Sequence, residues 1–193
     1  AGHGIGRRAR AHQSDGGNTF NGSVTVDNSG SSGRIRFATV TPDVYNGNAT
    51  FNSSGGQDVQ IAYSGDNLFA GAITINSNKV VFNTASGKVT FTGGNAQTLN
   101  GSYNYLFKKL AIDKSANHVI ANTTLSVDDT LFFVRGNLVT TSTNLLTMKH
   151  GSNANGASNS SFVSGPVKKV GNNEFKYPVG KNSSYYPIII SAP

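Results

Sequence analysis

The chain has 193 residues and no cysteine, and only 13% of its residues are charged, about half the usual ~25%. Without cysteine there is no disulfide scaffold, no thiolate metal site and no cysteine nucleophile. No run approaches the ~18 apolar residues of a membrane span. The net charge is +7, but the basic residues lie singly or in short groups, and this scatter argues against nucleic-acid binding.

The first 17 residues differ from the rest of the chain. They carry Arg7, Arg8 and Arg10, one large apolar residue and no regular apolar period. They contain no apolar core of a signal peptide. We expect an irregular basic arm or linker over residues 1–17; a basic arm for an anionic surface is the alternative.

Beyond residue 17 the composition favours β-structure. Val, Ile and Thr fill the ordered-looking segments, and they favour a pleated, half-buried surface. Asn, Gly, Ser and Asp separate these segments at short intervals, as in turns. The composition therefore predicts an all-β chain of many short strands.

A sequence repeat organises the first half of the chain. The pattern is aromatic, any residue, Gly, any residue, aliphatic or Ala, Thr, large apolar, and it occurs at residues 20–26, 45–51 and 69–75. The copies begin 25 and 24 residues apart. A weaker copy at residues 87–91 follows after a shorter interval. The aromatic and glycine positions that define the repeat are Phe20, Gly22, Tyr45, Gly47, Phe69 and Gly71.

A second apolar segment lies between the copies, at residues 34–37, 58–61 and 79–82. Two short strands cannot bury an apolar face alone, whereas stacked units bury a continuous core. A period of 20–50 residues is typical of such stacks. We therefore expect a β-solenoid, specifically a parallel β-helix, over residues 18–160. About eight coils would give a body on the order of 40 Å long. An antiparallel β-sandwich, which also has short, evenly spaced strands, is the alternative.

The last segment, residues 161–193, carries a recognisable block. Residues 161–171 are Ser-Phe-Val-Ser-Gly-Pro-Val-Lys-Lys-Val-Gly, residues 174–181 are Glu-Phe-Lys-Tyr-Pro-Val-Gly-Lys, and residues 185–190 are Tyr-Tyr-Pro-Ile-Ile-Ile. This order resembles a block in large, repeat-rich surface proteins of the Bacteroidota type, many secreted by the type IX route and some described as adhesins. The upstream repeats resemble those that precede that block.

The resemblance implies an extracellular, cell-surface location and a repeat-built segment of a longer bacterial protein. It implies no activity. The sequence stops within an expected strand at Ile188–Ile190, and an open solenoid end is normally covered. We expect that the C-terminal block continues into a missing or neighbouring segment, or that its end is covered by another copy.

One pair of carboxylates in the sequence is a candidate for catalytic chemistry. Asp43 and Asp66 are 23 residues apart, close to one coil, and each precedes a repeat aromatic. Two carboxylates facing a sugar at about 5–10 Å can cleave a glycosidic bond, so this pair is the carbohydrate-site candidate. The alternative role is an ordinary turn. The four histidines lack metal-ligand spacing, and calcium and phosphate loops are missing from the sequence. We expect no cofactor and no metal.

The aromatic residues allow two interpretations. The seven tyrosines could form a carbohydrate-stacking face, or Phe20, Tyr45 and Phe69 could stack as a ladder along the coils. The repeat favours the ladder. The sequence thus predicts a structural or adhesive surface module or filament without turnover, with surface glycans as possible partners. The alternative is a β-helix that binds or cleaves polysaccharides.

Overall fold

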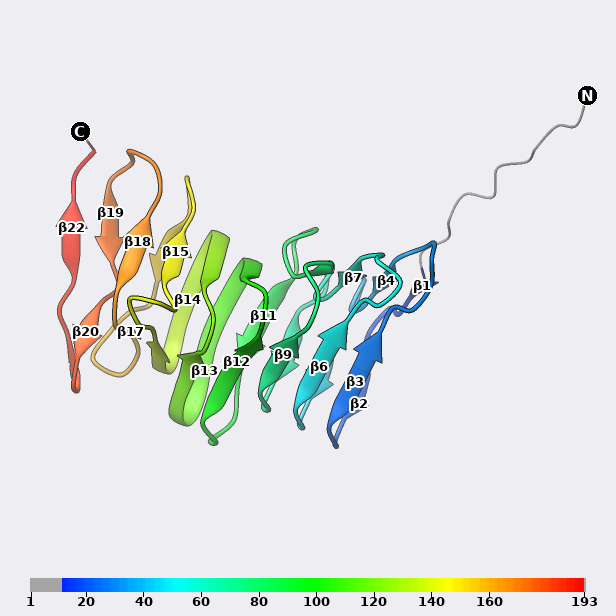
Figure 1. Ribbon diagram of the computed structural model, residues 1–193. Helices are drawn as coiled ribbons and strands as arrows, with labels where there is room; N and C mark the ends of the chain where they lie inside the picture. The colour runs from blue at the N-terminus through cyan, green and yellow to red at the C-terminus, as the bar shows by residue number, and fades with distance from the viewer. Residues whose placement is uncertain (1–11, 193) are drawn as a thin grey trace, which may run out of the picture.

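The protein was analysed as a computed structural model, which describes residues 12–192. Every regular element in that range is a β-strand, and the strands stack in one row of about 7 turns (Figure 1). The expected parallel β-helix is therefore confirmed, and the antiparallel sandwich is not the architecture. Strand β1 lies at one end of the row and β22 at the other (Figure 1).

Each coil passes through three faces, and neighbouring coils pair in parallel. Face one contains β1 (His12–Gln13), β4 (Ile35–Arg36), β7 (Val59–Gln60), β10 (Val80–Val81), β15 (Leu146–Met148) and β18 (Val167–Lys169). Face two contains β2 (Thr19–Phe20), β5 (Asp43–Tyr45), β8 (Asn67–Phe69), β11 (Lys88–Phe91) and β16 (Asn153–Asn155). Face three contains β3 (Val24–Asp27), β6 (Ala49–Asn52), β9 (Ile73–Ile75), β12 (Gln97–Gly101) and β17 (Val163–Ser164).

Two long strands run through all three faces. They are β13 (Tyr105–Ala121) and β14 (Leu125–Val139), and they pair with each other in parallel along most of their length. Their pairing register shifts between Phe107 and Lys109 and again beyond Ile112. Such irregularities bend a strand without ending it, so these two coils turn their corners as continuous strands.

The repeat aromatics form a ladder inside face two, as the sequence predicted. The ring centroids of Phe20 and Tyr45 lie 4.8 Å apart, and those of Tyr45 and Phe69 lie 4.4 Å apart with an interplanar angle of 6°. Tyr45 and Phe69 are fully buried. The ladder continues to Phe91 with a more tilted contact of 6.3 Å. Backbone register aligns the rings, because Phe20, Tyr45 and Phe69 are direct partners in β2, β5 and β8.

The repeat glycines lie where the chain turns between faces two and three, and successive coils approach closely there. A Cβ atom on Gly47 would lie 2.4 Å from the carbonyl carbon and oxygen of Gly22. A Cβ atom on Gly71 would lie 2.2 Å from the Gly47 carbonyl oxygen. Gly22 itself faces open space. Glycine at 47 and 71 therefore permits the coil spacing, while glycine at 22 is sterically unconstrained in the described structure.

Polar side chains complete the corner where β11 turns into β12. Gln97 is fully buried, and its Nε2 donates to the carbonyl oxygens of Phe69 at 2.7 Å and Gly71 at 2.9 Å. Lys114, also buried, donates through Nζ to the Thr92 carbonyl oxygen at 2.6 Å and to the Gln97 side-chain oxygen. Burial lowers the pKa of Lys114. The Phe69 oxygen also accepts from the Thr92 backbone N at 2.8 Å, so Gln97 adds a second donor there. Together the two side chains bond backbone oxygens of successive coils at this corner.

The boundaries differ from those expected. The first coil begins at His12, whose strand β1 pairs with β4, so the end of the segment 1–17 belongs to the solenoid. Residues 1–11, with the three arginines, lie outside the described residues. Parallel stacking also extends beyond residue 160, because β17 pairs with β14 and β18 pairs with β15.

The C-terminal block then reverses direction. Strand β19 (Phe175–Tyr177) pairs with β22 (Ile188–Ile190), and β20 (Gly180–Lys181) pairs with β21 (Ser184–Tyr185); both pairs are antiparallel. An isolated parallel bridge joins Val163 to Val179, just before β20. The block therefore starts another coil and folds back over it.

We predict that Gly47→Ala lowers the free energy of unfolding by about 1–3 kcal/mol, because its methyl group overlaps backbone atoms that only a shift of the coil can move. The matched control is Gly22→Ala, which adds the same methyl group in open space and should change stability by less than about 0.5 kcal/mol. Urea unfolding of the two variants measures the difference. Equal losses in both would contradict the close-packed corner.

We predict opposite outcomes for two buried tyrosines whose pKa is raised by burial. The Tyr105 hydroxyl donates toward the carbonyl oxygens of Asn100 at 2.7 Å and Ile73 at 3.0 Å. The Tyr45 hydroxyl has no partner in the described structure. Tyr105→Phe should therefore cost about 1–2 kcal/mol, whereas Tyr45→Phe should be neutral or stabilising by up to about 1 kcal/mol. Urea midpoints test this, and a larger loss at Tyr45 would contradict it.

Candidate functional site

Asp43, the first member of the predicted carbohydrate pair, lies inside the solenoid and is fully buried. Its Oδ1 accepts hydrogen bonds from the Asn18 backbone N at 3.0 Å and from Asn18 Nδ2 at 2.7 Å. Its own backbone N donates to Asn67 Oδ1 at 3.1 Å. Asn18, Asp43 and Asn67 thus form a polar ladder along three successive coils, beside the aromatic ladder.

Three buried polar atoms of this ladder region have no hydrogen-bond partner in the described structure: Asp43 Oδ2, Asn67 Nδ2 and the Tyr45 hydroxyl. Burial raises the pKa of Tyr45, and the nearby Asp43 carboxylate adds to that rise. The Asp43 carboxylate has no solvent-accessible surface, so it does not face a polysaccharide bound outside the solenoid.

Asp66 lies on the outside. Its carboxylate forms an ion pair with Lys88 Nζ at 2.9 Å and accepts from the Lys88 backbone N at 3.0 Å. The register explains the separation, because Asp43 is aligned with Asn67 rather than with Asp66. A shift of one residue along a strand moves a side chain to the other face of the sheet. The structure therefore does not bring Asp43 and Asp66 onto one surface.

Histidines and acids do not gather elsewhere in the described residues. His12, His118 and His150 are exposed and far apart in the strand order, and His3 lies outside the described range. Within residues 12–192 no three His, Asp or Glu side chains are placed to hold a metal ion together.

The tyrosines do not form one face. Tyr45 and Tyr105 are interior, and Tyr63 lies beneath the Arg36 guanidinium, 4.4 Å from its ring centroid. Tyr103 and Tyr186 are exposed, by 40% and 63%, in different parts of the chain. The ladder interpretation is confirmed, and the exposed Tyr103 lies on the side of the solenoid beside a hollow.

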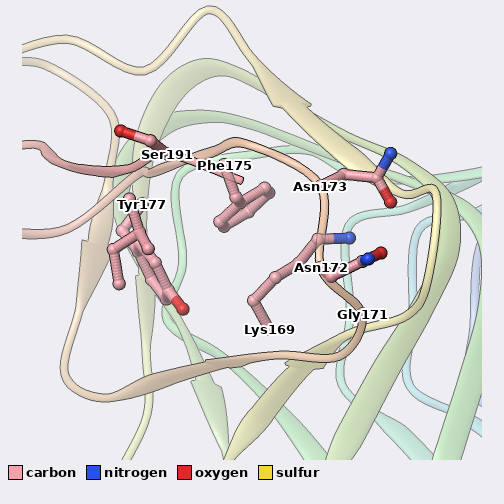
Figure 2. A pocket seen from close by; sticks show the side chains of 8 residues that line it. Lys169, Gly171, Asn172, Asn173, Phe175, Tyr177 and Ser191 are labelled. Atoms are coloured by element: carbon pink, nitrogen blue, oxygen red, sulfur yellow. The ribbon is translucent and has the colours of Figure 1, made fainter. Parts of the chain in front are cut away.

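A hollow of about 280 Å³ lies at the C-terminal end. Figure 2 shows Phe175, Tyr177, Lys169 and two asparagines around it. Lys169 Nζ donates to the carbonyl oxygens of Lys149 at 2.5 Å and Ser152 at 3.0 Å, and lies 5.1 Å from the Phe175 ring centroid. Burial lowers the pKa of Lys169. The lysine therefore holds the last coil to the one before it.

An apolar hollow of about 380 Å³ lies beside it, between β18 and β22. Val167, Tyr177 and Val179 line one part, and Ile188 and Ile190 line the other. All three isoleucines of β22 are more than half exposed. Because paired residues project to the same side, Ile188 and Ile190 share the core side with Tyr177 and Phe175. This end of the solenoid presents core-facing apolar residues to solvent.

A third hollow, of about 400 Å³, opens on face one between β10 and β13. Its lining combines amide, hydroxyl, apolar and aromatic side chains with one lysine. Sequence reasoning missed this site, although the shortened interval before residues 87–91 marked the irregularity in the repeat nearby.

Among the described residues there is no helix with the length and hydropathy needed to cross a bilayer. Comparison of the chain with known protein families, with curated proteins and with solved structures finds no match in any of the three.

Proposed function

We propose that the chain is a structural or adhesive module of a bacterial surface protein, which works by rigid display and not by turnover. The observation that carries the proposal is the continuous parallel pairing of the 14-stranded sheet, from β2 and β3 to β17 and β18. Each coil pairs with the next one, and the core runs along the whole stack. Such a stack holds what it carries at a fixed distance and orientation.

The arrangement of side chains supports the same proposal. Asp43 and Asn67 of the polar ladder are buried, whereas the outer column of face three is Thr25, Thr50, Thr74 and Asn100, aligned from coil to coil. Uncharged hydroxyls and amides at regular spacing suit contact with neutral or hydrated polymers. The extracellular location rests on the resemblance of residues 161–190 to surface proteins of the Bacteroidota type.

The alternative function is cleavage of polysaccharides by the Asp43 and Asp66 pair. The burial of Asp43 and the outward position of Asp66 favour display over cleavage. Display therefore requires that the chain retains a polymer without hydrolysing it.

We predict that particles coated with the folded chain are retained under flow on surfaces carrying cellulose, chitin, pectin or mucin, and that none of these polymers gains reducing ends. Unfolding the coat with urea should abolish retention. New reducing ends at substoichiometric protein would contradict the proposal, and their loss in Asp43→Asn with Asp66→Asn would establish the alternative. Equal retention by folded, unfolded and uncoated particles would also contradict it.

A filament of stacked copies is a variant of the same function. The exposed apolar end formed by β18 and β22 fits a second copy that adds its first coil there. Contacts between opposite ends generate open assemblies.

We predict that the sedimentation coefficient of the chain rises with protein concentration, and that Ile190→Lys abolishes the rise by placing a charge in the apolar end. Val134→Lys is the matched control, because Val134 is 54% exposed and Ile190 is 53% exposed, and it should associate like the unmodified chain. Sedimentation velocity measures both. A chain that stays monomeric at every concentration would contradict the filament.

A further inference from the structure

The pairing on face one is interrupted at one place. The four-stranded sheet of β1, β4, β7 and β10 ends at β10. The next strand of face one is the start of β13, which belongs to the 14-stranded sheet. An isolated bridge between Phe82 and Phe107 joins the two strands. The hollow of about 400 Å³ lies where β10 and β13 separate.

The interruption coincides with a change in coil length. Partners on face one are 24 residues apart from β4 to β7, 21 apart from β7 to β10, and 25 apart between Phe82 and Phe107. A short coil followed by a long one places the turns at Asn78 and Tyr103 beside the separated strands. The hollow is therefore built by the chain path and does not depend on either end of the stack.

The lining has two kinds of surface. Apolar contact comes from Val81, Leu106 and the exposed ring of Tyr103. Hydrogen-bonding groups come from three amides, one hydroxyl and one ammonium: Asn78, Asn83, Asn104, Ser126 and Lys149. The amide of Asn83 is oriented by its bond to Asp128, in which Nδ2 donates to Oδ2 at 3.0 Å.

This combination matches the chemistry of a sugar. A pyranose ring has an apolar C–H face that stacks on an aromatic ring, and a rim of hydroxyls that both donate and accept. Asparagine amides also donate and accept, and pockets that fix a ligand by a few polar groups around an apolar wall are the usual form of small-ligand sites. One cation is too few for a nucleic-acid backbone, which needs several.

We propose that the hollow between β10 and β13 binds one or two units of a saccharide chain. One ring lies against Tyr103, its hydroxyls bond to Asn78, Asn83 and Asn104, and the Lys149 ammonium receives a carboxylate where the saccharide carries one. The inference rests on the proposed adhesive function, to which it adds a ligand class and a place.

The test is titration of the full chain with soluble oligosaccharides: cellohexaose, chitohexaose, xylohexaose and oligogalacturonate, followed by amide NMR and calorimetry. We expect at least one to bind with a Kd of about 1 mM or tighter and to shift the side-chain amide signals of Asn83 and Asn104. Tyr103→Ala should weaken binding roughly tenfold or more, and Tyr103→Phe, which keeps the ring, should stay within about threefold.

Two further variants sharpen the result. Tyr186→Ala removes a tyrosine that is exposed outside the hollow, and it should leave binding unchanged. Lys149→Gln should weaken oligogalacturonate and leave the neutral oligosaccharides unchanged. Binding that survives Tyr103→Ala, or no binding by any of the four probes, would overturn the proposal.

This failure can be told apart from failure of the proposed function. If the folded chain binds none of the four oligosaccharides, yet particles coated with it are retained on polymer-carrying surfaces, only the proposed saccharide site is contradicted. A chain that releases reducing ends overturns the function of display, whether or not the hollow binds sugar.

Discussion

Backbone pairing between successive coils, at about 4.8 Å, is the constraint on which the rest of this structure depends. A coil of three short strands has no core of its own, and it becomes stable only when its neighbours cover it. The corner glycines follow from this spacing, because the backbone of Gly47 lies against Gly22 and that of Gly71 lies against Gly47 with no room for a methyl group. The stacked aromatic rings follow from it as well, since 4.4 Å between Tyr45 and Phe69 is one coil step.

The same constraint sorts polar groups between inside and outside. A column in register repeats its environment from coil to coil, so Asp43 and Asn67 are both buried while Thr25, Thr50 and Thr74 share the outer side of face three. At the corner between β11 and β12, Gln97 and Lys114 donate to the Gly71 and Thr92 carbonyl oxygens. Where the coil length changes, β10 and β13 separate and a hollow forms. The proposed saccharide site thus lies where the regular pairing between successive coils is interrupted.

The sequence was informative where a pattern recurs and uninformative where it changes. The aromatic and glycine positions recur at nearly constant spacing, so the fold class and the ladder of Phe20, Tyr45 and Phe69 could be predicted. The carboxylate pair could not be placed, because spacings of 23 and 24 residues look alike in a sequence but put side chains on opposite faces of a strand. The first strand at His12 and the continuity of the long strands β13 and β14 were not predicted, since none of these three strands carries the repeat motif.

The central claim, parallel stacking in this register, can be tested directly because the chain has no cysteine of its own. Thr50 and Thr74 are direct partners on adjacent coils, and a Cα separation of about 4.8 Å lies within the range that a disulfide spans. Thr25 and Thr74 are two coils apart, beyond about 7 Å. Under mild oxidation, Thr50→Cys with Thr74→Cys should form an intramolecular disulfide, and Thr25→Cys with Thr74→Cys should stay reduced. A disulfide in the second pair, or none in the first, would contradict the account.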